Sequence, residues 1–121
     1  IKPINQASEA IHRLRPVSFR YKAEVEPTRP LSFGLIAEEV EKVNPDLVTH
    51  AKDGKPLSVR YDQVNAMLLN EFLREHHTVQ ELKRTVAEQQ KQIATLAAGL
   101  QKVSAQLELS KAGPQTVLND Q

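Results

Sequence analysis

The side chains that could do chemistry in this chain are few, and their spacing does not suit a metal site. Among its 121 residues are four histidines, at positions 12, 50, 76 and 77. The adjacent pair His76 and His77 cannot present two ligands on one face of a helix, because that requires a spacing of four residues. We therefore interpret the pair as solvated helix residues, and we predict neither a metal site nor a cofactor.

The hydroxyl and acidic residues form no catalytic pattern either. The serines of the first half, Ser8, Ser18, Ser32 and Ser58, have no recognisable base or nucleophile elbow. Glu38, Glu39 and Glu41 fall in a short predicted helix, where acidic residues near the N-terminus suit the helix dipole better than they suit a catalytic pair. We predict no catalytic residue in the chain.

Composition excludes several classes of protein. The net charge is +1, from 16 Lys and Arg against 15 Asp and Glu, and no concentrated basic stretch predicts nucleic-acid binding. The absence of Cys excludes disulfides and thiolate metal sites. No apolar run approaches the roughly 20 residues that span a bilayer, so we predict no membrane partner. The first residue is Ile1 and not Met, from which we expect a fragment of a longer protein.

The first half of the chain is punctuated by proline. Six of the seven prolines precede residue 62, which is typical of short elements joined by turns. We predict a small α+β head over residues 1–61. Its expected elements are a helix from an Asn5 cap to Leu14, strands over 17–21 and 31–36, a helix over 37–43 that ends at Asn44-Pro45, and a hairpin of 47–51 with 57–61 around Asp53-Gly54.

The second half predicts one long helix from an Asp62 cap to Leu109, followed by a flexible tail over 110–121. Eight of nine consecutive heptad core positions are apolar, which is typical of a coiled coil. The predicted oligomer interface consists of these nine positions: Val79, Leu82, Val86, Gln89, Ile93, Leu96, Leu100, Val103 and Leu107.

The predicted head is too small to cover this stripe, so the stripe requires partners. Each buried Leu, Ile or Val contributes roughly 1.5–3 kcal/mol. The a positions change from Val and Ile to Leu, and the e and g positions are mainly small or neutral, which favours a parallel homotrimer. A dimer and an antiparallel helical hairpin within one chain remain alternatives.

The order of short motifs resembles a known family. Ile1-Lys-Pro-Ile4, Leu14-Arg-Pro-Val-Ser-Phe19 and Val59-Arg-Tyr61 flank the central block. That family motif comprises Gly34, Leu35, Ile36, Ala37, Glu38, Glu39 and Val40. Together they resemble, over residues 1–109, the intramolecular chaperone domain of phage endosialidases and tail fibres, the peptidase S74 family. The family is also represented in a myelin-regulatory transcription factor, and Gln is common where this chain has Glu38.

The resemblance implies a function. Such domains hold three chains of a β-rich fibre or tailspike in register while it folds, and then release themselves with a Ser–Lys dyad. The matching dyad would lie upstream of Ile1, so we expect the present chain to be proteolytically silent and its parent to cleave itself. The resemblance also implies the host cytoplasm during virion assembly. The alternative is an oligomerisation or adaptor module of a non-phage protein, such as a self-cleaving transcription factor.

Overall fold

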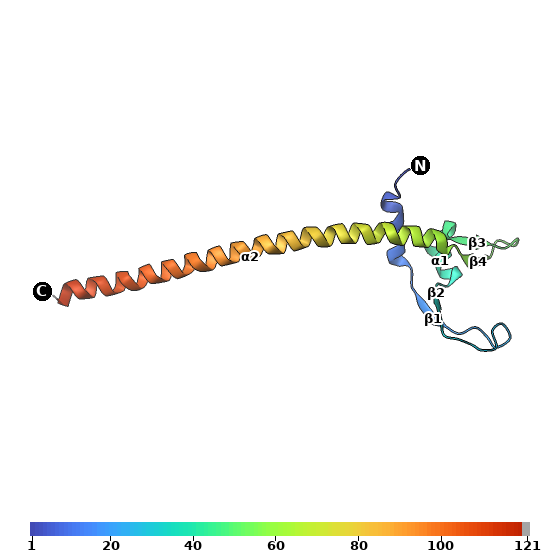
Figure 1. Cartoon of the computed structure of the whole chain (residues 1–121), viewed down its shortest axis with the longest axis horizontal. Helices are drawn as coiled ribbons and strands as arrows, with labels where there is room; N and C mark the ends of the chain where they lie inside the picture. The colour runs from blue at the N-terminus through green and yellow to red at the C-terminus, as the bar shows by residue number, and fades with distance from the viewer. Residues whose placement is uncertain (120–121) are drawn as a thin grey trace. The chain divides into compact units, whose positions relative to one another are not determined.

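The structure is a computed structural model that describes the backbone of residues 1–119 and the side chains of residues 1–112. The chain forms two compact units, Ile1–His76 and a second that begins at His77. The elements, in order, are η1 (Asn5–Arg13), β1 (Val17–Phe19), β2 (Ser32–Gly34), α1 (Ala37–Val43), η2 (Pro45–Leu47), β3 (Val48–His50), β4 (Pro56–Val59) and α2 (Tyr61–Asn119) (Figure 1). The predicted α+β head followed by a long helix is confirmed.

The first predicted helix is a 3₁₀ helix, not an α-helix. Asn5 does not cap it, because Ile4 occupies the cap position without a side-chain hydrogen bond, and Asn5 itself has a left-handed φ of 57°. The bonds at both ends of η1 join residues three apart, as a 3₁₀ helix requires. Ala10 is buried in the core.

Two separate antiparallel hairpins make up the strands of the head. β1 pairs with β2 so that Val17 lies opposite Gly34, and both strands are shorter than predicted. β3 pairs with β4, with an irregularity between Thr49 and His50. The predicted turn at Asp53-Gly54 is confirmed by Gly54, whose φ of 85° is readily adopted only by glycine.

The helix α1 has the bounds that the sequence predicts. Glu38 and Glu39 lie in its first turn, where they suit the helix dipole. Asn44 ends α1 and then caps η2, since its side-chain oxygen accepts a hydrogen bond from the backbone nitrogen of Asp46 at 3.0 Å. No pattern in the sequence predicted η2.

A small core holds the N-terminal unit together. It contains the buried hydrophobic residues Ala10, Val40, Leu47, Val48, Val64 and Met67. They come from η1, α1, η2, β3 and the first turns of α2, so the start of the long helix contributes to this core. For this reason the unit extends to His76, beyond the predicted head of residues 1–61.

The long helix differs from the prediction at both ends. It begins at Tyr61, so Asp62 lies in the first turn and not at the cap, where an acidic side chain still suits the dipole. It also continues past Leu109 to Asn119, through most of the predicted flexible tail; Asp120 and Gln121 lie outside the described residues. Among the described residues, no helix combines the length and apolarity needed to cross a bilayer.

Candidate functional site

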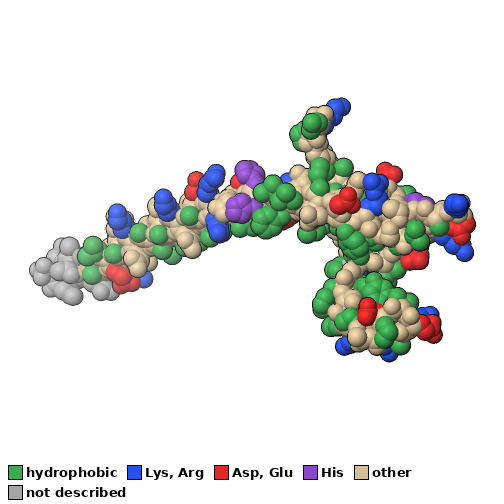
Figure 2. Space-filling model, turned by 45° about the vertical axis from the view of Figure 1, so that its right-hand side comes forward, with side chains coloured by type: hydrophobic (Ala, Val, Ile, Leu, Met, Phe, Trp, Pro, Cys, Tyr) green, Lys and Arg blue, Asp and Glu red, His purple; other side chains and the backbone are tan. Residues whose placement is uncertain are grey.

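The predicted oligomer interface is an apolar stripe that nothing in the described part of the chain covers. Its eight hydrophobic members, from Val79 to Leu107, are between 44% and 72% exposed, and Gln89 is exposed among them. Hydrophobic side chains are visible along this part of α2 beside lysines and arginines (Figure 2). Because α2 is one uninterrupted helix, the stripe is not folded back as an antiparallel hairpin. We refer to these nine residues as the α2 stripe.

The glycine of the family motif lies at a close approach to the side chain of Tyr61. An added Cβ at Gly34 would lie 2.8 Å from the hydroxyl of Tyr61. That hydroxyl accepts a hydrogen bond from the backbone nitrogen of Leu35 at 3.0 Å. The motif is thereby joined to the first residue of α2, which places the end of β2 directly against the start of the long helix.

The remaining motif residues build the head. Val40 is the most buried hydrophobic residue of the core, at 1% exposure. Leu35 and Ala37 pack against this core. Glu39 forms an ion pair with Arg15. The hydrogen bond from Arg15 lowers the pKa of the Glu39 carboxyl and raises the pKa of the guanidinium. Glu38 is exposed, so its departure from the common Gln changes no contact of the core.

A polar cluster that no sequence pattern predicted connects η1 to α2 by hydrogen bonds. Ser8, which is fully buried, donates a hydrogen bond to Oε1 of Glu71 at 2.6 Å. Asn70 donates to Ser8 Oγ at 2.7 Å and to the backbone oxygen of Asn5 at 3.1 Å. Arg74 bonds Oε1 of Glu71 at 3.0 Å. The contacts of Ser8 and Asn5 with Glu71 and Asn70 join segments about 60 residues apart in sequence, which is why no local pattern predicted them.

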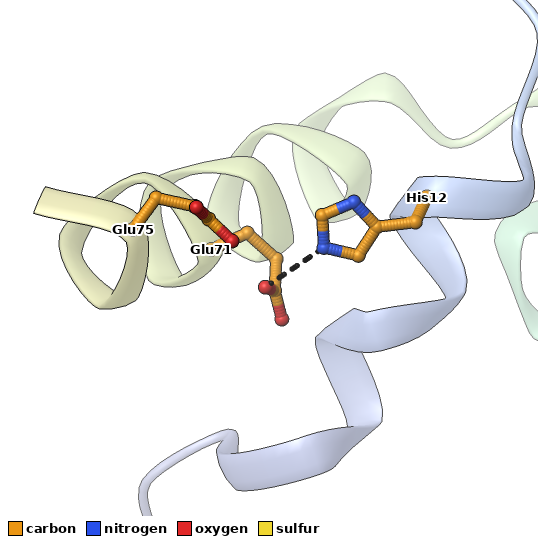
Figure 3. A group of neighbouring side chains, drawn as sticks. All are labelled: His12, Glu71 and Glu75. Atoms are coloured by element: carbon orange, nitrogen blue, oxygen red, sulfur yellow. Dashed lines mark hydrogen bonds and ion pairs between the residues drawn. The ribbon is translucent and has the colours of Figure 1, made fainter. Parts of the chain in front are cut away.

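The second carboxylate oxygen of Glu71 faces a histidine. His12 Nε2 lies 3.1 Å from Glu71 Oε2, and the Glu75 side chain lies next to them, one helical turn beyond Glu71 (Figure 3). The pKa of Glu71 is lowered, chiefly by the hydrogen bond from Ser8 and also by the bond with His12. The spacing of four residues between Glu71 and Glu75 was the one signal in the sequence that could have indicated this cluster.

This cluster does not have the geometry of a serine hydrolase. In such enzymes the imidazole bonds the serine hydroxyl and the carboxylate orients the imidazole. Here the carboxylate of Glu71 lies between the other two groups, and His12 makes no bond to Ser8. Ser8 is also wholly buried and accepts a hydrogen bond from Asn70. The hydroxyl therefore serves to hold η1 in place.

Comparison with protein families decides the resemblance. Residues 1–49 match the family model Peptidase_S74, described as the chaperone of endosialidase. The recognised family is confirmed. No curated protein matches the chain. The match covers residues 1–49 and supports a chaperone role for this chain.

The match to the endosialidase-chaperone model covers most of the helices and strands of the head. It includes η1, both strands of the first hairpin, α1 and most of β3, and with them the whole of the Gly34–Val40 motif. It ends at Thr49, so the likeness of residues 50–109 remains a prediction from the motif at Val59-Arg-Tyr61 and from the heptads. The matched segment contains both Arg15 and Glu39, whose ion pair joins two of the motifs on which the resemblance was based.

Proposed function

We propose that this chain is an intramolecular chaperone that trimerises through the α2 stripe and thereby registers three copies of an upstream β-rich fibre or tailspike domain. One observation carries the proposal, together with the family match: eight hydrophobic side chains repeat at heptad spacing on α2 and stay exposed in the single chain. Monomeric proteins rarely leave a continuous apolar surface of this extent in water. Sister copies of the same helix offer a matching surface, with knobs that enter the holes of the neighbour.

Three copies fit the stripe better than two. Leu100 and Leu107 place leucine at a positions, where Val or Ile would favour a dimer. The flanking e and g positions from Thr85 to Gln106 are mainly small or neutral, whereas dimers commonly carry charged pairs there. In a trimer these positions are more fully covered, so small and neutral side chains suit them.

The proposal includes self-cleavage by the parent polypeptide. Proteins of this family release the chaperone with a Ser–Lys dyad, whose lysine takes the proton of the serine hydroxyl once its pKa is lowered. Both residues would precede Ile1. This role would place the protein in the host cytoplasm during assembly of a phage or prophage particle.

A variant pair tests the chaperone role. In the parent polypeptide with its upstream residues, Ile93→Asp with Leu96→Asp should abolish assembly of the upstream domain, because six buried charges per trimer would oppose association. The matched control is Thr95→Asp with Ala98→Asp, which adds the same charges outside the heptad core. The yield of soluble, trimeric upstream domain is measured by gel filtration. Equal yields from the two double variants would contradict the proposal.

Exposed hydrophobic side chains on the head favour a second candidate, an adaptor that binds another protein. Phe33 on β2 and Leu57 on β4 are 77% and 68% exposed. A pull-down with the complete chain as bait, compared with a Phe33→Ser, Leu57→Ser variant, separates the two functions. A partner lost from the variant, with trimer mass retained, would support the adaptor.

A further inference from the structure

The cluster of His12, Glu71 and Glu75 has the composition of a metal site. The three side chains offer one imidazole nitrogen and two carboxylate oxygens, and these ligand atoms all lie within 4.8 Å of one another. For bonds of about 2.1 Å, two neighbouring ligands of one metal ion lie about 3.0–3.4 Å apart. His12 Nε2 and Glu71 Oε2 are 3.1 Å apart, so this pair already has the separation that a bound ion needs.

The protein fixes the central ligand from outside the cluster. Ser8 and Arg74 both bond Oε1 of Glu71, which leaves Oε2 directed at His12 (Figure 3). Hydrogen bonds that orient a ligating carboxylate commonly contribute to metal affinity. Glu71 is buried, with a side chain only 8% exposed, whereas His12 is 56% exposed, so an ion could reach the cluster from the solvent beside the imidazole.

Charge at the cluster favours a cation. Glu71 and Glu75 are like charges one helical turn apart, an arrangement that is unfavourable by itself. The Glu75 side chain has no hydrogen bond or ion pair with any of the described residues. Glu9 adds a third carboxylate, through its ion pair with Arg74. With a neutral imidazole, three carboxylates and one guanidinium leave a local charge of −2, which a divalent ion would neutralise.

We propose that His12, Glu71 and Glu75 bind a divalent first-row transition-metal ion, such as Zn²⁺, which cross-links η1 to α2. The imidazole distinguishes such ions from Mg²⁺ and Ca²⁺, which take oxygen ligands. With three protein ligands, the remaining coordination positions of the ion are open to water. Two ligands come from one helix and the third from a segment held to that helix by Ser8 and Asn70, so His12 and Glu71 are positioned before the ion binds.

Calorimetric titration of the complete, metal-free chain with ZnCl₂ at neutral pH tests this site. One ion should bind per chain, and His12→Ala and Glu75→Gln should each weaken binding at least tenfold, since each removes a ligand. Both side chains are exposed, so both variants should fold, and circular dichroism verifies it.

Two other histidine–glutamate pairs serve as controls. His50 lies 2.8 Å from Glu41, and His77 lies 3.2 Å from Glu81, and neither pair is part of the three-residue cluster. His50→Ala and His77→Ala should leave the affinity within about threefold of the wild type. No saturable binding, unchanged affinity in either ligand variant, or an equal loss in a control variant would overturn the site. The result does not depend on the trimer, whose mass is measured separately.

Discussion

Glu71 is the side chain through which η1 is held to the long helix. Its carboxylate accepts hydrogen bonds from Ser8 on η1 and from Arg74 on α2, and it pairs with His12. Polar contacts this well satisfied give a docked segment one position, because each alternative leaves a buried donor or acceptor unpaired. The N-terminal segment thus has a defined place on α2.

The pH dependence of stability should report on Glu71. Since its pKa is lowered in the folded state, its contribution is fully present above the ordinary value near 4.5 and is lost as the pH falls through the lowered pKa. The wild type should therefore exceed Glu71→Gln in stability at neutral pH, and the difference should shrink towards about pH 3.

Urea unfolding of both proteins between about pH 3 and pH 7 measures that difference. Ser8→Ala should reduce the same pH dependence in part, because the hydrogen bond from Ser8 is the main cause of the lowered pKa. The ion pair of Arg15 with Glu39 is common to all the proteins, so its contribution to the pH dependence cancels. Parallel stability curves for the wild type and Glu71→Gln would contradict the assigned role.

Gly34→Ala should destabilise the N-terminal unit by about 1–3 kcal/mol, the usual cost of overpacking. The added methyl group would lie 2.8 Å from the Tyr61 hydroxyl and would displace this hydroxyl, which accepts a hydrogen bond from the backbone nitrogen of Leu35. A double-mutant cycle with Tyr61→Phe isolates the clash. The cost of Gly34→Ala should fall by at least about 0.5 kcal/mol once the hydroxyl is absent; an unchanged cost would show that another contact requires the glycine.

At the scale of elements, the sequence predicts those whose signals are local. Helix α1 was predicted with its observed bounds, since an apolar pattern and Asn44-Pro45 define it. The turn at Gly54 was predicted from Asp-Gly. The type of η1 was not, because apolar residues three and four apart fit both an α-helix and a 3₁₀ helix.

Local signals in the sequence did not predict the ends of α2 or the contacts between distant segments. The cap of α2 was misplaced by one residue, because Asp62 suits the first turn as well as the cap. Gly113-Pro114 suggested an end to the helix that the structure does not have. The contact of Ser8 with Glu71 depends on how η1 packs across α2, which neither sequence pattern contains.

Gly99 gives a test of α2 itself. Glycine in a helix interior is less favourable than alanine by roughly 0.8–1.0 kcal/mol, and an added Cβ at Gly99 meets no atom within 4 Å. Gly99→Ala should therefore raise the stability of α2 by about 1 kcal/mol per chain, seen as a higher midpoint of thermal unfolding followed by circular dichroism. A lower midpoint would show that a sister helix packs too closely at Gly99 to admit the methyl group.

At the scale of the molecule, the family match and the α2 stripe concern different units. The match lies in the N-terminal unit, whereas the stripe belongs to the unit that begins at His77. The match supports the chaperone role, and the stripe supplies the reason to propose self-association. Helix α2 runs through both units, so assembly through its later turns would bring together three heads built on its first turns.

Sedimentation equilibrium of the chain at micromolar concentration tests the central claim, that the α2 stripe is covered by copies of itself. The chain has a mass of 13.6 kDa, so the account predicts a single species of three copies, about 41 kDa. A stable species of 13.6 kDa across the concentration range would contradict it.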